Sequence, residues 1–212
     1  MKTEILKLLK EESGFVSGQE LCDRFGVSRT AVWKAIGQLK EEGFQIEAVR
    51  NKGYRLLSSD DVITEAELMS CMEGGLVRKI VYYEETDSTN IRARKLAEEG
   101  APDGTLVVTD FQNAGRGRRG RMWVSPSGTG VFMSLILRPD ILPSSASMLT
   151  LVAALAVHDG IKETTGLDTV IKWPNDIVGD GRKLCGILTE MSAELEGIHY
   201  VVTGIGINVN MT

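Results

Sequence analysis

Four arginines and three glycines alternate between Gly115 and Arg121 of this 212-residue chain, in the order Gly115, Arg116, Gly117, Arg118, Arg119, Gly120, Arg121. Glycine lets a backbone approach a ligand closely, and arginine supplies a planar, permanently charged fork that suits phosphate or carboxylate. The stretch has no apolar face for a core. We interpret it as a loop that becomes ordered around an anionic ligand. The alternative is a solvated basic loop that touches nucleic acid nonspecifically.

A second polar group lies near the ends of the strands expected at 170–173 and 183–190, and comprises Lys172, Asn175, Asp176 and Lys183. Lysines beside arginines repel one another unless an anion lies between them, and triphosphate or adenylate chemistry meets that condition. The sequence has no Walker-type or Rossmann glycine motif and no convincing Ser/His/Asp set. Of the reaction classes considered, nucleotidyl transfer remains. In that chemistry, positioning and charge neutralisation do most of the catalysis.

A third polar group precedes the helix expected at 91–99, and comprises Ser88, Thr89 and Asn90. Such side chains cap helices, and at a helix N-terminus they also suit a small polar or anionic ligand group. Trp123 follows the arginine loop, where it is either core or a stacking surface.

The amino-acid composition argues against a membrane protein and against a zinc protein. The net charge is -5, with 42% hydrophobic and 25% charged residues, which is ordinary for a soluble protein. We expect no membrane partner, because no apolar run approaches the roughly 20 residues of a span. Three separated cysteines and two histidines argue against a zinc site and for reduced thiols in the cytoplasm.

Residues 1–60 are predicted to form a winged helix-turn-helix, and residues 61–212 a second domain, with a polar linker at 58–61. Ser17 and Ser28 have the spacing of helix N-caps, and a hairpin with a basic tip follows the third helix. Packing or dimerisation is the alternative use of such a unit. We favour DNA binding, through a recognition helix and a wing, by Ser28, Arg29, Thr30, Trp33, Lys34 and Lys52.

The second domain is predicted to be α+β, with a mixed, largely antiparallel sheet and helices behind it. Strands are expected at 80–83, 105–109, 131–137, 170–173, 183–190 and 199–209. The arginine loop would connect two of these strands. A helix at 144–164 is apolar on nearly all sides, so we expect it to be buried against the sheet.

Several of these blocks together resemble the signature motifs of biotin protein ligases: 87–90, 115–120, 172–176, 183–188 and 204–208. With the N-terminal winged helix, the chain is similar to the bifunctional family that is both ligase and biotin-operon repressor. The resemblance implies a class II synthetase-like catalytic domain. In that family a small C-terminal barrel domain usually follows, and we expect it to be absent from this chain.

The resemblance also implies roles for individual residues. Lys183 and Arg118 would be catalytic, and Asp176 would hold Mg²⁺. ATP and its adenylate would meet Arg118, Arg119, Arg121, Trp123, Asn175 and Asn208. Biotin would contact Ser88, Thr89, Asn90, Gln112, Gly115, Arg116, Gly117, Arg118, Lys183, Gly186 and Gly204.

By the same resemblance, biotin and ATP would form biotinyl-5′-AMP, and a lysine of a biotin carboxyl-carrier protein would accept the biotin. The adenylate would act as corepressor and favour a homodimer on operator DNA. Two alternatives stay open. One is a noncatalytic, biotin-sensing DNA-binding repressor, and the other is a lipoate ligase with a related sheet.

Overall fold

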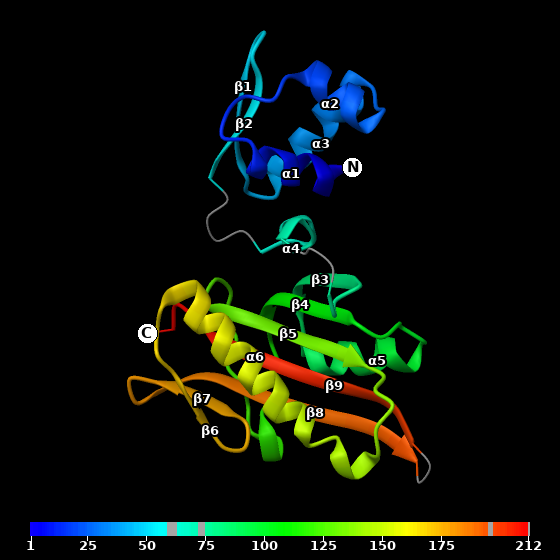
Figure 1. Cartoon of the computed structure of the whole chain (residues 1–212), viewed down its shortest axis with the longest axis vertical. Coiled ribbons are helices and arrows are strands. Elements are labelled where there is room, and N and C mark those ends of the chain that lie inside the picture. The colour runs from blue at the N-terminus through cyan, green and yellow to red at the C-terminus, as the bar shows by residue number, and fades with distance from the viewer. Residues whose placement is uncertain (59–62, 72–74, 195–196, 212) are drawn as a thin grey trace. The chain divides into compact units, whose positions relative to one another are not determined.

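Two units make up the chain, Met1–Glu73 and Gly74–Thr212 (Figure 1). The computed structural model describes residues 1–58, 63–71, 75–194 and 197–211. The boundary expected after residue 60, and most of the linker expected at 58–61, lie outside the described residues. Helix α4 (Glu65–Cys71) belongs to the first unit, because Ala66 joins its core and Glu67 pairs with Lys10 of the first helix.

Helix ends in the first unit follow the capping residues. The Ser17 hydroxyl accepts a hydrogen bond from Glu20 N at 3.1 Å, and the Ser28 hydroxyl accepts one from Ala31 N at 3.2 Å. Gly26 ends the second helix with φ +64°, a left-handed conformation that glycine tolerates best. The remaining elements are α1 (Lys2–Glu11), α2 (Gly18–Phe25), α3 (Arg29–Glu41), β1 (Gln45–Val49) and β2 (Gly53–Ser58).

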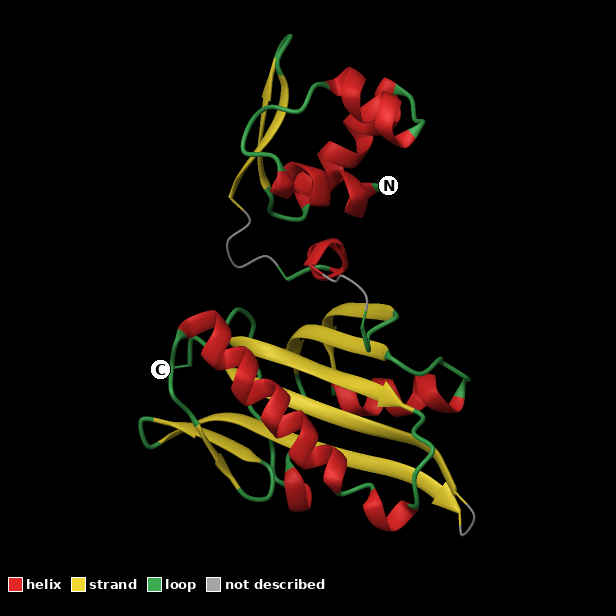
Figure 2. Ribbon diagram, in the orientation of Figure 1, coloured by secondary structure: helices red, strands yellow, loops and turns green. Residues whose placement is uncertain are grey.

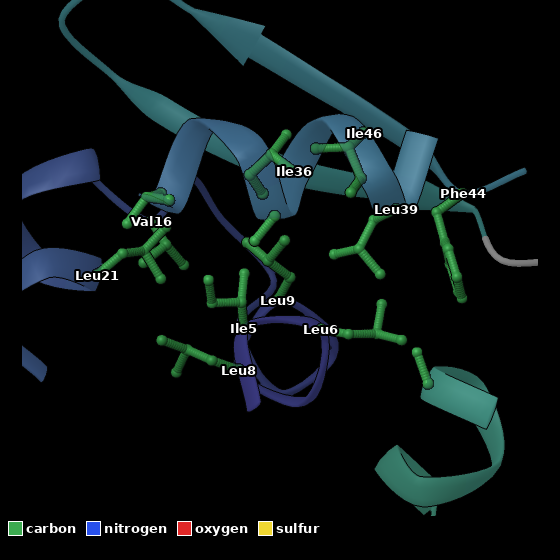
Figure 3. Packing of buried hydrophobic residues seen from close by; sticks show 13 residues of the cluster. Ile5, Leu6, Leu8, Leu9, Val16, Leu21, Ile36, Leu39, Phe44 and Ile46 are labelled. Atoms are coloured by element: carbon green, nitrogen blue, oxygen red, sulfur yellow. The ribbon is translucent and has the colours of Figure 1, made fainter. Parts of the chain in front are cut away.

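The core of this unit lies between its helices and its hairpin. Figure 3 shows side chains of α1, including Ile5 and Leu9, pointing toward Ile36 and Leu39 of α3. All of these side chains are buried, and Leu21 of α2 joins them. The unit therefore has its own apolar core, to which all of its first three helices contribute.

The second unit is built on a mixed sheet of seven strands in the order β3-β4-β5-β9-β8-β7-β6. Only β3 and β4 are parallel among the described pairs, so the expectation of a largely antiparallel α+β domain is confirmed. The strands are β3 (Lys79–Thr86), β4 (Thr105–Gln112), β5 (Gly130–Leu137), β6 (Val170–Lys172), β7 (Asp176–Gly179), β8 (Arg182–Glu194) and β9 (Gly197–Asn208).

Two helices lie on opposite faces of this sheet (Figure 2). Helix α5 (Thr89–Glu98) packs Ala93 and Ala97 with Val107, Ile136 and other residues of one face. Helix α6 (Met148–Thr165) packs on the other face, against a cluster that includes Ile177 and Ile187. Side chains alternate along a strand, so Ile205 and Ile207 face α6 while Gly204 and Gly206 face the α5 side.

The expected burial of the long apolar helix is wrong. In α6 only Ala154 and Val157 are buried, and Met148, Val152 and Leu155 are more than half exposed. The described residues cover only the face of α6 that meets the sheet. Within the described residues, the segment Pro143–Thr165 is the one helix long and apolar enough for a membrane span by length and composition. Its packing along the sheet makes that weak evidence for a span.

Candidate functional site

The candidate site forms where the arginine loop meets the N-terminus of α5. The loop is tied to the turn before that helix by two backbone hydrogen bonds, from Asn113 N to Thr86 O and from Ala114 N to Asp87 O, both at 2.9 Å. Beyond them the loop folds back on itself, since Trp123 N donates to Gly115 O at 2.9 Å. Arginines distant in sequence from Ser88 are thereby brought to the same end of α5.

A buried polar network lines the floor beside that helix end. Thr89 donates to Gln112 Oε1 through its backbone N at 2.9 Å and its hydroxyl at 3.2 Å. Ser134 of β5 lies 2.8 Å from Thr89 Oγ1 and donates to Asn90 Oδ1 at 2.6 Å. All four side chains are buried. A buried network with its members paired holds each side chain in one orientation.

Asn90 is fixed from two further directions. Its amide nitrogen donates to Glu190 Oε2 at 2.8 Å. A Cβ on Gly204 would lie 1.9 Å from Asn90 Oδ1, so only glycine leaves room for the amide at that place on β9. Ser134 and Glu190 were not predicted as site residues. The one available signal was a serine inside an otherwise apolar strand, because Glu190 meets Asn90 only through the fold.

The other end of the site is cationic. Lys183 Nζ lies 2.7 Å from Asp176 Oδ1 and 5.2 Å from the centroid of the Trp123 ring. The indole lies directly over two glycines: a Cβ on Gly206 or on Gly186 would come within 2.6 or 2.7 Å of it. Trp123 Nε1 is buried and has no hydrogen-bond partner among the described residues. A buried donor without a partner is costly, and a ligand acceptor would satisfy it.

One cavity connects the two ends. Its lining includes many residues predicted from the sequence, namely Ser88, Thr89, Asn90, Gln112, Arg116, Gly117, Arg118, Trp123, Asn175, Lys183, Gly186 and Gly204. The remaining lining residues, to which no ligand contact was assigned from the sequence, are Met133, Ile187, Leu188, Ile205 and Gly206. The lining thus combines neutral hydrogen-bonding groups beside the start of α5 with apolar side chains, with Lys183 beside Trp123, and with two arginines of the loop.

Other predicted residues lie outside this lining, and include Asp176, which pairs with Lys183. Gly115 is buried in the loop, where a Cβ would lie 2.3 Å from Trp123 O, and Arg119 and Arg121 are exposed. Arg121 O accepts from Gly117 N at 2.7 Å, so its backbone shapes the loop. Asn208 lines a different, apolar cavity beside α6, and its amide nitrogen donates to Lys183 O at 3.0 Å.

Two ionisable groups near the cavity have shifted pKa values. Burial opposes ionisation of Asp87, but hydrogen bonds from Ser88 N and the Thr86 hydroxyl, with Arg92 beside them, lower the pKa of its carboxyl overall. Burial raises the pKa of the Cys185 thiol to about 12; nearby Lys183 opposes that rise and Asp176 adds to it. Cys185 is therefore an uncharged core residue and no nucleophile at neutral pH.

The donor set at Asp176 gives little support to a protein-built metal site. Its Oδ1 is already paired with the Lys183 ammonium. Within residues 1–58, 63–71, 75–194 and 197–211, no group of three His, Cys, Asp or Glu side chains could hold a metal ion. Magnesium usually binds through one or two carboxylates together with substrate phosphates. The residues present do not form a cage for it.

The first unit presents a separate candidate interface. Arg29, Arg50 and Lys52 line one cleft, between the N-termini of α2 and α3 and the hairpin tip. Gly53 (φ +116°) allows the hairpin to dock on the segment before α2, since a Cβ there would lie 2.0 Å from Val16 O. The Arg29 guanidinium donates to Gln19 Oε1 at 2.9 Å.

Thr30, Trp33 and Lys34 are exposed on α3, as predicted for a recognition helix. Ser28 has another task as well, because its hydroxyl caps α3.

Comparison with known proteins matches both units. The sequence model of the biotin/lipoate A/B protein ligase family matches residues 82–208, and that of an HTH domain matches residues 2–55. The "Bifunctional ligase/repressor BirA" of Bacillus subtilis is 48% identical, over 99% of this chain and 65% of its own length. The protein of that name from Escherichia coli is 34% identical, over 93% and 60%.

Among solved structures, a biotin protein ligase from Aquifex aeolicus in complex with biotin and ATP is similar, with a TM-score of 0.55 and 36% identity. The match covers 63% of this chain and 53% of that one. A Leishmania major biotin protein ligase in complex with biotinyl-5-AMP has a TM-score of 0.55 and 29% identity, over 63% and 58%. The chain spans about 65% of the length of the Bacillus relative it matches.

Proposed function

We propose a function from one premise: the chain belongs to the biotin/lipoate A/B protein ligase family. The second unit is a biotin–protein ligase domain that activates biotin with ATP, and the first is a DNA-binding head that makes the whole a biotin-responsive repressor. The proposed place of action is the cytoplasm. Relatives named as bifunctional ligase/repressors support both roles.

The observation that carries the ligase proposal is the polarity of the cavity. Biotin has a neutral, hydrogen-bonding ureido ring at one end and a carboxylate at the other. Thr89, Asn90 and Gln112 supply paired, oriented polar groups where the ring would lie. Lys183 supplies positive charge at the other end, beside Trp123, where the carboxylate would meet ATP, and Arg116 and Arg118 line the same cavity.

In the proposed first step, a biotin carboxylate oxygen attacks the α-phosphorus of ATP. A P–O bond forms, the bond from that phosphorus to the bridging oxygen breaks, and pyrophosphate leaves. Negative charge grows on the α-phosphate oxygens, and Lys183 would neutralise it. Arg118 would hold the phosphates, and the exposed Arg119 and Arg121 would join it when the loop closes. Asn175 lines the same cavity and would meet the adenine.

In the proposed second step, the amine of a carrier-protein lysine attacks the biotinyl carbonyl carbon. An amide forms, the bond to the phosphate oxygen breaks, and AMP leaves with the electron pair. The acceptor would be the biotin carboxyl-carrier protein of a biotin-dependent carboxylase. Exposed arginines over the cavity would release the adenylate only when the loop opens, which protects the mixed anhydride from water.

Magnesium would enter this reaction bound to the phosphates of ATP, as it commonly does where a protein supplies only one or two carboxylates. We assign Asp176 a different part, in which its carboxylate orients the Lys183 ammonium across their 2.7 Å ion pair. Asn208 would help to position the same lysine, because its amide nitrogen donates a hydrogen bond to Lys183 O.

The repressor part of the proposal rests on the winged helix-turn-helix. Basic residues line the cleft between α3 and the hairpin tip, where a wing would meet the DNA backbone. The biotinyl adenylate would favour a homodimer, and two heads would then bind a two-fold operator. Full-length protein should therefore bind operator DNA more tightly with biotin and ATP than without. Equal affinity in both conditions would remove the regulatory role.

Substrate choice tests the ligase proposal. Pyrophosphate release from ATP is measured with biotin, with lipoate and with neither, using the full chain. We expect pyrophosphate release with biotin and not with lipoate. The buried network of Thr89, Asn90 and Gln112 matches a ureido ring, and lipoate has no such group. Release with lipoate but not biotin would instead make this a lipoate ligase. Tight biotin binding without any release would leave a noncatalytic biotin sensor.

A further inference from the structure

The recognition helix carries a large apolar side chain that the protein does not use for packing. Trp33 of α3 is 70% exposed, whereas Val32, Ala35, Ile36 and Leu39 form the buried side of the same helix. Exposing an indole to water forgoes the burial that usually stabilises it. In the helical projection the ring lies outside the buried stripe of α3, between Arg29 and Gly37.

The surroundings of this ring favour a polyanionic partner. Arg29 and Lys34 flank it, and the first two turns of α3, residues 29–36, contain no acidic residue. The hairpin tip adds Arg50 and Lys52 on the same cleft as Arg29. Residues 1–58 carry ten Lys and Arg against eight Asp and Glu, a net charge of +2, whereas the whole chain carries -5. Positive charge is therefore concentrated in residues 1–58, the helix-turn-helix and hairpin that present the tryptophan, whereas residues 59–73 of the same unit add five acidic residues and no basic one.

Space is open beside the ring. Gly37 lies one turn further along the exposed side of α3, and a Cβ built there would have no atom within 4 Å. The ring can therefore be approached by a rigid surface without rearrangement of its own helix. In the major groove the apolar feature is the C5 methyl group of thymine, which side chains read by apolar contact.

We propose that Trp33 is a specificity-determining residue, whose indole contacts thymine methyl groups in the major groove of duplex DNA. Arg29, Arg50 and Lys52 then position the head on phosphates without reading sequence. This inference rests on the proposed DNA-binding function. It adds the residue that discriminates between sequences and the base feature that it reads.

The test couples one protein side chain to one DNA methyl group. A duplex is first selected from a random pool by the full chain with biotin, ATP and Mg²⁺. Each thymine is then replaced by dU, which removes only the methyl. Losing one contacted methyl should weaken binding by the parent about fourfold, from the burial of one CH₂-sized group. In Trp33→Ala the same dU substitutions should have no effect, while Trp33→Phe should keep part of it.

Controls distinguish failure of the proposed role of Trp33 from failure of DNA binding itself. Leu57→Ala removes another exposed apolar side chain of the same unit and should leave the dU effect intact. Thermal unfolding of Trp33→Ala should match the parent, since the ring packs on little. Failure to select any preferred duplex would overturn the DNA-binding function itself. Selective binding with equal dU effects in parent and Trp33→Ala would overturn only the role of Trp33.

Discussion

Gly204 and Asn90 share one small space, because a Cβ on Gly204 would lie 1.9 Å from Asn90 Oδ1. The glycine on β9 thus determines where the first turn of α5 presents its amide. Gly204→Ala should displace Asn90 from its hydrogen bonds with Ser134 and Glu190, and weaken biotin binding by at least about tenfold. Isothermal titration calorimetry measures the change.

The matched control for that substitution is Gly160→Ala in α6. A Cβ there meets nothing within 4 Å, and alanine favours a helix by roughly 1 kcal/mol over glycine. We expect this variant to unfold at a higher temperature and to bind biotin as the parent does. Unchanged biotin affinity in Gly204→Ala would show that Asn90 is not part of the binding surface.

Asp176→Asn tests the ion pair with Lys183. Without the carboxylate the ammonium loses its fixed partner at 2.7 Å, so the rate of adenylate formation should fall about tenfold or more while biotin affinity changes little. Single-turnover kinetics separate the two effects. Asp180→Asn, in the exposed turn between β7 and β8, serves as control. A rate restored by raising Mg²⁺ would contradict the positioning role and favour a metal ligand.

The lowered pKa of Asp87 predicts that the second unit loses stability at acid pH. Its folded pKa lies below the ordinary value, so its ionised form stabilises the fold above about pH 4, and this contribution disappears as pH falls through the lowered pKa. Asp87→Asn should therefore lower the unfolding temperature at pH 7 and converge with the parent in acid. Parallel curves at all pH values, or a similar loss in the exposed Asp140→Asn, would argue against this linkage.

The three cysteines should react in the order of their exposure. Cys71 is exposed, Cys22 is intermediate, and Cys185 is buried with its thiol pKa raised to about 12. A thiolate-selective reagent at pH 8 should label Cys71 first and spare Cys185 until denaturant is added. Mass spectrometry of the labelled peptides gives the order. Rapid native labelling of Cys185 would mean that β8 opens readily beneath Lys183.

Local patterns in the sequence were sufficient to predict much of the fold. Ser17 and Ser28 have capping spacings that tertiary contacts do not override, and their hydroxyls accept the expected bonds from Glu20 N and Ala31 N. The order of strands and helices along the chain likewise predicted a largely antiparallel sheet. The long apolar helix misled for a physical reason: apolar composition implies a partner surface, and the described residues cover one face of α6 only.

Site residues within short sequence motifs could be predicted. Those brought to the site only by contacts between distant segments could not. The polar residues at the start of α5, the arginine loop and Lys183 were identified from their sequence patterns. Glu190 was not, because its partner Asn90 lies 100 residues away in the chain. From the sequence alone Trp123 is either core or a stacking surface. In the structure it lies over Gly186 and Gly206 as part of the cavity wall, a position that depends on the register of β8 and β9.

Biotin-dependent exchange of radiolabelled pyrophosphate into ATP tests the proposed ligase chemistry most directly. It is measured on the full chain, on Lys183→Ala and on the control Lys95→Ala, which changes an exposed lysine of α5. We expect exchange by the parent and by Lys95→Ala. We expect a loss of about 10²–10³-fold in Lys183→Ala, because the charge that grows on the α-phosphate loses its counterion. Exchange by Lys183→Ala at the parental rate would contradict the proposed chemistry.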